Sequence, residues 1–341
     1  MTKVMRRWEM TAFGRNNLFL SQVPVPAVRS GEVLVKVSAV ALNNRDNNVI
    51  EAGGGLDVTF PFTPASDMAG TVVKIGENSC RFKPGDRVIS TFTPGWLEGR
   101  PLGDARDPAY RSLGGFHPGV LSEFVSFPEA WFVAAPTSLD DGEASTLPCA
   151  GLTAWFALVE RGQLRAGQTV VVQGTGGVAL FGLQIAKAHG AEVFLTSSSP
   201  EKLERAKTLG ADHGINRQAE DWVEAVWSRT GNRGADHILE VAGGSNLGKS
   251  LHAVAAGGHI AVISALEGSE VSAPILPLLL KVPRISGISV GHRRALEDLV
   301  AAVDRTRIKP VIDKRYRLED LPAALDHLNR GAFGKLVIEI A

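Results

Sequence analysis

The chain has 341 residues, of which 44% are hydrophobic and 21% charged, so it has enough apolar material for two folded domains. Lysine plus arginine equals aspartate plus glutamate at 36 each, which excludes a general electrostatic attraction to nucleic acid or an anionic membrane but leaves room for a local phosphate pocket. Cys80 and Cys149 are the only cysteines, which excludes a disulfide framework and a four-cysteine zinc lobe.

The apolar stretches of the chain are short. Residues 1–10 contain charges and no apolar core of signal-peptide length. Residues 271–282 are the most apolar later stretch, but two prolines and Lys281 interrupt them, well short of the roughly 20 residues of a membrane helix. We therefore expect a soluble, cytoplasmic protein with neither a membrane nor a nucleic acid as partner.

The first third of the sequence is rich in predicted strands. Residues 32–41 are largely β-branched and alternate in part, and residues 70–75 continue the pattern. The Pro84-Gly85-Asp86 run then predicts a turn, after which residues 87–89 begin another strand.

A glycine- and proline-rich segment, residues 93–119, follows these strands. It predicts a long surface loop without regular structure. Loops of this length are often functional, although a tolerated insertion explains the composition equally well. The sequence leaves both interpretations open.

From about residue 140 the pattern changes to short apolar strands that alternate with helices. This alternation is typical of a parallel sheet covered on both faces. The strands expected here are 169–173, 192–196, 237–241, 259–263 and 284–290, and the helices are 140–147, 152–161, 179–189 and 200–209. A later amphipathic helix at 293–305 and a strand at 334–340 complete the chain.

The strongest local signal is VVVQGTGGVA, which joins an apolar strand to a helix. It is a G-x-G-x-x-A fingerprint in the context that makes this motif informative. Gly174 permits the tight turn, Gly176 lets the backbone approach a pyrophosphate, and Ala179 lets the helix pack closely on the strand. Gly177 and Val178 open the helix, whose free N–H groups favour phosphate. The motif predicts a dinucleotide site.

The end of the next strand bears on the choice of cofactor. An enzyme that uses NAD usually places a carboxylate there, on the ribose 2′-hydroxyl. Here Ser197 and Ser198 end the strand, and no carboxylate follows until Glu201. These hydroxyls with Lys202 and Arg217 suit a 2′-phosphate, so we predict NADPH (NADP). The alternative is that the serines only cap the next helix while Lys202 is solvated.

Several further segments, together with the fingerprint and its position midway along the chain, resemble the medium-chain dehydrogenase/reductase superfamily. Within it the sequence is most similar to the zinc-independent, quinone oxidoreductase-like branch, over essentially all 341 residues. The matching segments include GEVLVK at 31–36, KPGDRV at 83–88, LPCAGLTA at 147–154, IKPV at 308–311 and FGKLV at 333–337.

This resemblance implies an α/β fold in which a doubly wound Rossmann parallel sheet is inserted into a GroES-like, β-rich substrate domain. Residues 1–135 would form the first part of the substrate domain, 136–289 the NADPH-binding domain and 290–341 the return, with the active site in the cleft. The resemblance also implies further cofactor contacts at Thr153, Gly243, Ile263, Ser264, Ser289, Gly291 and Lys335. Each of these residues equally suits ordinary turn or strand-end chemistry.

The metal-binding positions of zinc-dependent relatives resemble Asn43, Ser66 and Cys149 in this chain, with Asp67 beside the second. A catalytic zinc usually takes three protein ligands, and amide and hydroxyl groups substitute poorly for thiolate and imidazole. We therefore expect no metal and interpret Cys149 as a small buried side chain.

Metal-free relatives carry an N-x-x-D arrangement beside the nicotinamide, which corresponds here to Asn43 and Asp46. Asn43 would bind the cofactor ribose or the substrate oxygen, and Asp46 would orient Asn43 or a water. A tyrosine common in the branch is replaced by Asn48, which puts a tyrosine proton donor in doubt and makes Asn48 a further candidate. The alternative is a polar loop in which these side chains hold local turns.

The resulting prediction is an NADPH-dependent oxidoreductase that transfers hydride to a quinone or an α,β-unsaturated carbonyl without metal. A metal-free alcohol or aldehyde dehydrogenase of the same family and a non-catalytic NADPH-binding protein remain as alternatives. The apolar strand at 284–290 would be an exposed edge unless it is paired, so we also expect a homodimer.

Overall fold

The computed structural model describes residues 3–55, 58–107, 110–268 and 270–340, and it divides into two compact units. We call Met1–Leu152 together with Gly291–Ala341 the split unit, and Thr153–Val290 the inserted unit. The units divide after Leu152 rather than at the predicted residue 135, because the helices that follow residue 140 pack on strands of the split unit. The predicted domain boundaries themselves stay a prediction.

The inserted unit is built on a parallel sheet in the strand order β10-β9-β8-β11-β12-β13. Its strands are β8 (Thr169–Gln173), β9 (Glu192–Ser197), β10 (His213–Asn216), β11 (Ala235–Glu240), β12 (Val254–Val262) and β13 (Arg284–Gly287). All five residues of β8 are buried, as expected for a central strand with both faces covered.

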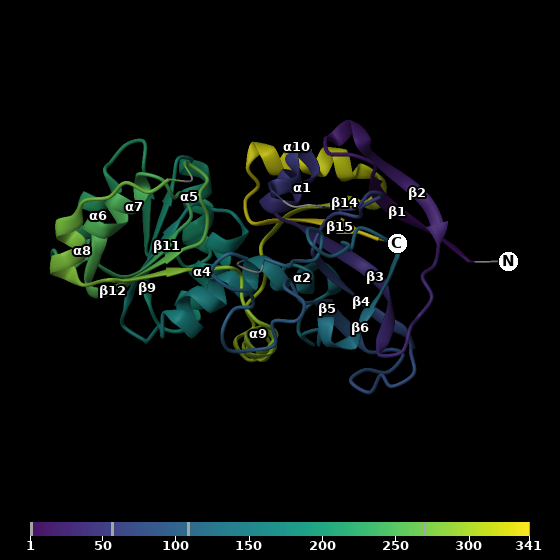
Figure 1. Cartoon of the computed structure of the whole chain (residues 1–341). Helices are drawn as coiled ribbons and strands as arrows, with labels where there is room; N and C mark the ends of the chain where they lie inside the picture. The colour runs from purple at the N-terminus through teal and green to yellow at the C-terminus, as the bar shows by residue number, and fades with distance from the viewer. Residues whose placement is uncertain (1–2, 56–57, 108–109, 269, 341) are drawn as a thin grey trace. The chain divides into compact units, whose positions relative to one another are not determined.

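Helices cover both faces of this sheet (Figure 1). They are α4 (Gly177–Ala188), α5 (Pro200–Thr208), α6 (Trp222–Arg229), α7 (Asn246–Ala253) and α8 (Ile275–Lys281). Neighbouring residues of β11 point to opposite faces: Ile238 joins the apolar cluster of α6 and α7, whereas Leu239 lies against Gly182 of α4. A β-carbon at Gly182 would lie 2.4 Å from the Leu239 side chain, so glycine allows α4 to sit close to the sheet.

The split unit contains a mixed sheet in the order β14-β15-β3-β4-β5-β7, with β6 also paired to β3. Its pairs are antiparallel except β14 with β15, which are parallel, and β1 and β2 form a separate antiparallel ribbon. The strands are β1 (Val4–Met10), β2 (Leu18–Pro24), β3 (Glu32–Leu42), β4 (Asp67–Ile75), β5 (Arg87–Ser90), β6 (Phe124–Pro128), β7 (Phe132–Ala134), β14 (Ile312–Arg317) and β15 (Lys335–Glu339).

The remaining helical segments connect and cover these strands. They are α1 (Asn44–Ala52), α2 (Asp141–Ala144), α3 (Leu152–Trp155), α9 (Arg293–Thr306) and α10 (Leu321–Arg330), with 3-10 turns η1 (Arg15–Asn17), η2 (Gly53–Gly55), η3 (Glu129–Trp131) and η6 (Leu318–Asp320). Two π-helical turns, η4 (Leu147–Gly151) and η5 (Phe156–Arg161), flank α3. The helix predicted at 152–161 is therefore α-helical only in its first turn.

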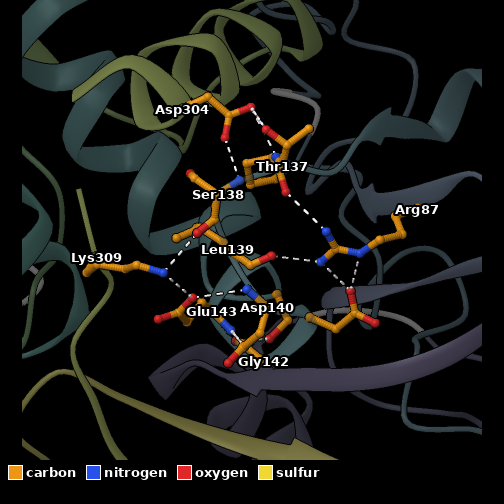
Figure 2. A network of polar contacts seen from close by, with 12 residues as sticks. Arg87, Thr137, Ser138, Leu139, Asp140, Gly142, Glu143, Asp304 and Lys309 are labelled. Atoms are coloured by element: carbon orange, nitrogen blue, oxygen red, sulfur yellow. Dashed lines mark hydrogen bonds and ion pairs between the residues drawn. The ribbon is translucent and has the colours of Figure 1, made fainter. Parts of the chain in front are cut away.

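A polar network fastens the C-terminal segment to the start of α2 (Figure 2). Asp304 of α9 accepts hydrogen bonds from the backbone N–H groups of Thr137 and Ser138 at 3.0 and 2.8 Å. Lys309 donates to the Ser138 carbonyl at 2.9 Å, and Arg87 of β5 donates to the Leu139 carbonyl at 2.9 Å. These bonds join segments that lie far apart in sequence, so the start and the end of the chain form one unit.

The elements predicted from the sequence are largely confirmed. The strands predicted at 32–41, 87–89 and 169–173 correspond to β3, β5 and β8, and the helix at 293–305 corresponds to α9. The prediction missed the ribbon β1–β2, the short strands β6, β7, β10 and β14, and helices α1, α6, α7, α8 and α10. Among the described residues no helix is long and apolar enough to cross a membrane.

Candidate active site and dinucleotide pocket

The glycine fingerprint forms a tight turn between β8 and α4. Gly174 has φ +84°, a left-handed conformation that favours glycine, and its N–H donates to the Thr196 carbonyl at 2.8 Å. Gly176 is the residue before the helix, in extended backbone. A β-carbon on either glycine would meet nothing within 4 Å. The glycine turn before α4 therefore borders free space, and the first N–H groups of the helix have no partners within the helix itself.

A cavity of about 520 Å³ lies at the carboxyl ends of the strands in the inserted unit. Its lining consists of Gln173, Gly174, Thr196, Arg217, Gln218, Ala219, Glu220, Asp221, Trp222, Val241, Ala242, Asn246, Lys249, Leu266 and Glu267. This is the edge of an open α/β sheet where nucleotides bind. Of the predicted cofactor residues, Gly174 and Arg217 line the cavity, and the other lining residues were not predicted from the sequence.

The residues predicted to bind a 2′-phosphate lie in different local environments. Ser197 accepts a hydrogen bond from the Ser199 N–H at 3.2 Å, and Ser199 caps α5 by accepting from the Lys202 N–H at 3.3 Å. The alternative interpretation, in which the serines only cap the next helix, therefore holds for Ser199. Arg217 lies in the cavity wall with Nη1 3.5 Å from Oε1 of Glu267, and both side chains are about half exposed. Lys249 adds a second cation to the same wall.

Buried Glu240 ends β11 and fixes the floor of this cavity. Its carboxylate accepts hydrogen bonds from the Gln173 and Asn246 amides and from the backbone N–H groups of Ala242 and Gly243. Gly243 has φ +72° and leaves no room for a β-carbon beside Ala265. Glu240 was not predicted as a site residue, although a carboxylate at the end of an apolar strand is a signal that the sequence does carry.

The split unit contains a second constellation, which we call the buried polar cluster: Asn43, Asp46, Asp67, Cys149 and Lys335. Four of these residues are buried, whereas Cys149, predicted to be a small buried side chain, is half-buried. Lys335 at the start of β15 donates from Nζ to the Leu42 carbonyl and to Oδ1 of Asn43, both at 2.6 Å. The backbone N–H of Asn43 donates to Asp46 at 2.8 Å. The amide nitrogen Nδ2 of Asn43 faces Asp67 but makes no hydrogen bond of good geometry within the described residues.

Asp67 connects the rest of this cluster. Its carboxylate accepts from the Ser66 hydroxyl at 2.6 Å and from the Cys149 backbone N–H at 3.0 Å. Asp46 and Asp67 are fully buried, and Lys335 is 4% exposed. The ends of β3 and η4 and the starts of α1, β4 and β15 therefore meet around two carboxylates and one ammonium group.

Burial controls the protonation of these groups. It raises the pKa of Asp67 to about 6, although the Lys335 ammonium and the hydrogen bond from Ser66 oppose the rise. Burial also raises the pKa of Asp46, against the attraction of Arg45. The Cys149 thiol has its pKa raised by burial and by Asp67, so it stays protonated. The cluster thus holds neutral and charged donors in a dry environment.

The residues at the zinc positions of the family do not fit a metal. Oδ1 of Asn43 already accepts a hydrogen bond from the Lys335 ammonium, and the Ser66 hydroxyl donates to Asp67, which leaves Cys149 as the one strong zinc ligand among the three positions. A divalent cation would add a second positive charge beside Lys335. Within the described ranges, no group of three or more His, Cys, Asp and Glu side chains has a metal-binding arrangement.

The other predicted site residues lie in varied places. Asn48 is exposed on α1, whereas Asn43 and Asp46 are buried. Thr153 is buried in α3, Ser289 is exposed after β13, and Gly291 is buried. Ile263 and Ser264 follow β12 and do not line the cavity, whereas Leu266 and Glu267, shortly after them, do. Gly177 and Val178 form the first turn of α4, and Ser198 lies between β9 and α5.

Comparison with known proteins identifies both units. Residues 29–137 match the family described as alcohol dehydrogenase GroES-like domain, and residues 177–305 match the family described as zinc-binding dehydrogenase. A structure from Sinorhizobium meliloti, assigned provisionally as an alcohol dehydrogenase, has 65% sequence identity and a TM-score of 0.97, over 99% of both chains.

Two curated relatives extend the comparison. A zinc-type alcohol dehydrogenase-like protein of Schizosaccharomyces pombe is 37% identical over 91% of both chains. A quinone oxidoreductase of Rattus norvegicus is 28% identical over 98% of both chains. The predicted α/β fold, a parallel Rossmann sheet with a GroES-like β domain, is confirmed. The predicted similarity to the quinone oxidoreductase-like branch holds at the level of the superfamily, because that identity is the lower one.

Proposed function

This chain belongs to the medium-chain dehydrogenase/reductase superfamily, and from that premise we propose that it is a zinc-independent, NADPH-dependent oxidoreductase of a carbonyl–alcohol pair. The superfamily consists of oxidoreductases that typically use a nicotinamide cofactor and a small-molecule substrate. The observation that carries the proposal is that Asn43, which stands where zinc-dependent relatives have a metal ligand by resemblance, accepts a hydrogen bond of 2.6 Å from Lys335.

The inserted unit supplies the features of a dinucleotide site. When bound, a reduced nicotinamide supplies a hydride to an electron-poor carbon. The open turn at Gly174 and Gly176 and the start of α4 would hold the pyrophosphate. The hydrogen bonds that Glu240 accepts from Ala242 and Gly243 hold the neighbouring turn in place beside the cavity.

The choice of NADPH rests on the charges around the cavity. No carboxylate follows Ser197 at the end of β9, where an acidic side chain would bind a ribose 2′-hydroxyl. Arg217 and Lys249 lie in the cavity wall instead, and they suit a 2′-phosphate. Arg217 lies 3.5 Å from Glu267, and this ion pair would have to break for Arg217 to bind the phosphate.

The buried polar cluster supplies the groups for the substrate oxygen. Nδ2 of Asn43 is a hydrogen-bond donor held in place through Lys335 on Oδ1 and Asp46 on the backbone. A preorganised donor of this kind stabilises negative charge on oxygen by about 3 kcal/mol. Asp46 would position Asn43 rather than contact the substrate. Lys335 was predicted as a cofactor contact, and its hydrogen bonds instead suggest a role in positioning Asn43.

A quinone or an α,β-unsaturated carbonyl remains a second candidate substrate. The 28% identity to a quinone oxidoreductase over 98% of the chain favours it. An alcohol–aldehyde or alcohol–ketone pair has the stronger support, because the proteins of 65% and 37% identity are described as alcohol dehydrogenases or similar to them.

A homodimer is the proposed assembly. Strand β13 is the last strand of its sheet, and α8 beside it exposes Ile275, Leu276, Leu279 and Leu280. A second copy would cover this apolar surface and continue the sheet. Replacing Leu280 by Glu is expected to give monomers in sedimentation, and an unchanged dimer would argue against this interface.

The test of the proposed function is a substrate panel assayed on protein of measured zinc content. NADPH or NADH is supplied with aldehydes, ketones, enones and quinones, and NADP with alcohols. The proposal expects NADPH-dependent reduction of aldehydes or ketones by protein with far less than one zinc per chain. Turnover that requires stoichiometric zinc, or NADPH binding with no turnover of any substrate, would contradict it.

A further inference from the structure

The long loop between β5 and β6 is the element in the split unit that the function does not yet explain. Its ends are firmly held: the Leu113 N–H donates to the Phe92 carbonyl at 3.0 Å, and the Gly119 N–H donates to the Thr63 carbonyl at 2.7 Å. Phe92 and Leu113 are fully buried. The ends of the segment predicted either as a functional loop or as a tolerated insertion are therefore part of the folded unit, and the second end bonds to the backbone that leads to Ser66 and Asp67, whereas residues 97–107 are exposed.

Arg45, within the Asn43-Asn44-Arg45-Asp46 motif, joins this loop to the buried polar cluster. Its Nη1 donates to the Leu113 carbonyl and its Nη2 donates to the Ser112 hydroxyl, both at 3.0 Å. The same Nη1 lies 3.4 Å from Oδ1 of Asp46. One guanidinium thus connects the loop backbone to a cluster carboxylate.

Tyr110 lies on this guanidinium. The Arg45 Cζ atom is 6.0 Å from the centre of the Tyr110 ring. The centres of the Tyr110 and Phe92 rings are 5.7 Å apart, and the two ring planes are tilted by 55° to each other. The Ser112 N–H donates to the Tyr110 carbonyl at 3.1 Å, which fixes the backbone two residues before the Arg45 contact. Tyr110 keeps 40% of its surface exposed, so the side chain is held in place yet open to a ligand.

The reaction proposed above requires a proton as well as a hydride. Hydride addition brings two electrons to the carbonyl carbon, and the carbonyl π pair moves to oxygen, which must then gain a proton. Lys335 is buried and already donates to two acceptors, and Asp67 accepts hydrogen bonds from Ser66 and Cys149. The position where the family resemblance places a tyrosine is Asn48 here, so the proton must come from elsewhere.

We propose that Tyr110, presented by the loop between β5 and β6 and held by Arg45, is the proton donor to the substrate oxygen in carbonyl reduction. This inference rests on the proposed function. The phenolic O–H bond breaks as the substrate O–H bond forms, and water returns a proton to the phenolate. The net reaction consumes one reduced cofactor, one proton and one carbonyl, and it gives one alcohol and one oxidised cofactor.

The electrostatic surroundings keep the phenol of Tyr110 in its protonated form. Burial raises the pKa of Tyr110 to about 12; Arg45 opposes the rise, while Cys149, Asp46 and Asp67 contribute to it. The phenol therefore stays protonated across the neutral range and is ready to give a proton to an oxyanion. In alcohol oxidation the same oxygen would act as the base, because the two directions share one transition state.

The test compares Tyr110→Phe with Tyr316→Phe, the two tyrosines of the chain. Phenylalanine at 110 keeps the ring on Arg45 and Phe92 and removes only the hydroxyl. Tyr316 bonds His327 at 2.9 Å outside the cluster and is the matched control. We expect Tyr110→Phe to lower kcat for aldehydes or ketones by roughly 100-fold or more, with NADPH affinity and thermal unfolding unchanged.

The size of the loss should depend on the substrate. A hydroquinone oxygen is far more acidic than an alcohol and needs less help from a general acid, so quinone reduction should fall by roughly tenfold or less in Tyr110→Phe. A structural role of the hydroxyl would lower both rates equally. This ratio therefore separates proton donation from an effect on the loop.

Three outcomes would overturn the assignment. Equal kcat in Tyr110→Phe and Tyr316→Phe for carbonyl substrates rejects the proton donor while leaving the proposed function intact. Full activity of Tyr110→Phe together with a large loss in Cys149→Ala transfers the role to the thiol. Absence of hydride transfer by the unaltered protein rejects the proposed function, and the donor assignment with it.

Discussion

The dinucleotide pocket of the inserted unit and the buried polar cluster of the split unit are built in opposite ways. The pocket consists of open space at two glycines, a helix start and a cavity of about 520 Å³, with cations that are partly solvated. The cluster contains three ionisable side chains, Asp46, Asp67 and Lys335, that are almost completely enclosed and hydrogen-bonded to their neighbours. Substitutions in the first should change ligand affinity, whereas substitutions in the second should change stability and chemistry together.

The largest effect is expected from Lys335→Met. This change leaves Asp46 and Asp67 buried without the cation that they share. It also removes the hydrogen bond that Lys335 donates to Oδ1 of Asn43. Loss of one partner from a buried charged group costs about 3–5 kcal/mol. Urea unfolding should show a loss of this size, accompanied by loss of activity. Lys314→Met is the control, because Lys314 is exposed; equal unfolding free energies of the two variants would contradict the account.

The pH dependence of Asp67→Asn should reveal the enclosed carboxylate. The folded pKa of Asp67, about 6, lies above its ordinary 3.8, so the folded protein binds more protons between those values. The unfolding free energy of the unaltered protein therefore falls as pH rises through about 4 to 6, by up to about 3 kcal/mol from this group. Asp67→Asn should not show this loss.

Asp304→Asn provides a control of opposite sign. Although partial burial acts the other way, hydrogen bonds from Thr137 and Ser138 lower the pKa of Asp304 to about 2 (Figure 2). Its stabilising contribution is present above about pH 4 and is lost as pH falls toward 2. If the unfolding free energies of Asp67→Asn and the unaltered protein differ by the same amount from pH 4 to 7, the pKa of Asp67 is not raised in the folded protein.

Gly176→Ala should affect ligand affinity without affecting stability. The added methyl meets nothing within 4 Å and the residue has φ −79°, so the fold should accept it. The methyl would occupy space meant for the pyrophosphate, and we expect the Kd for NADPH to rise about tenfold. Gly214→Ala in β10, where the new methyl makes ordinary contact with Leu203, is the control. If NADPH binding is unchanged in both variants, the cofactor does not bind at this turn.

The narrowest effect, confined to one of the two cofactors, is expected from Arg217→Gln. Loss of a charge-assisted hydrogen bond to a 2′-phosphate should weaken NADPH binding about tenfold and leave NADH binding nearly unchanged. Arg165→Gln, an exposed change elsewhere in the inserted unit, is the control. If Arg217→Gln weakens both cofactors equally, the guanidinium does not recognise the 2′-phosphate.

The two regions also differ in how well the sequence predicts them. The strand Thr169–Gln173 and its glycine turn are local features, because a fully buried strand is continuously apolar and the turn requires glycine. Arg217 could be proposed as a 2′-phosphate ligand from its charge alone. The rest of the cavity wall, including Lys249, comes from helices and loops whose packing no local pattern reveals.

The buried polar cluster was predicted only in part. Asn43 and Asp46 lie three residues apart and form a recognisable motif, but Lys335 reaches Asn43 from 292 residues further along the chain. Asp67 was noted only as the neighbour of a metal position. Tyr110 lies in a glycine- and proline-rich segment without periodicity, so nothing in the sequence indicates that it lies against Arg45.

Deuterium transfer tests the central claim most directly. Protein treated with a chelator and shown to hold far less than one zinc per chain is given an aldehyde together with NADPH in which both hydrogens at C4 of the nicotinamide are replaced by deuterium. We expect one deuterium in each alcohol molecule formed, at a rate that added zinc does not change. An alcohol without deuterium, or deuterium transfer that appears only when zinc is restored, would contradict a zinc-independent hydride transfer.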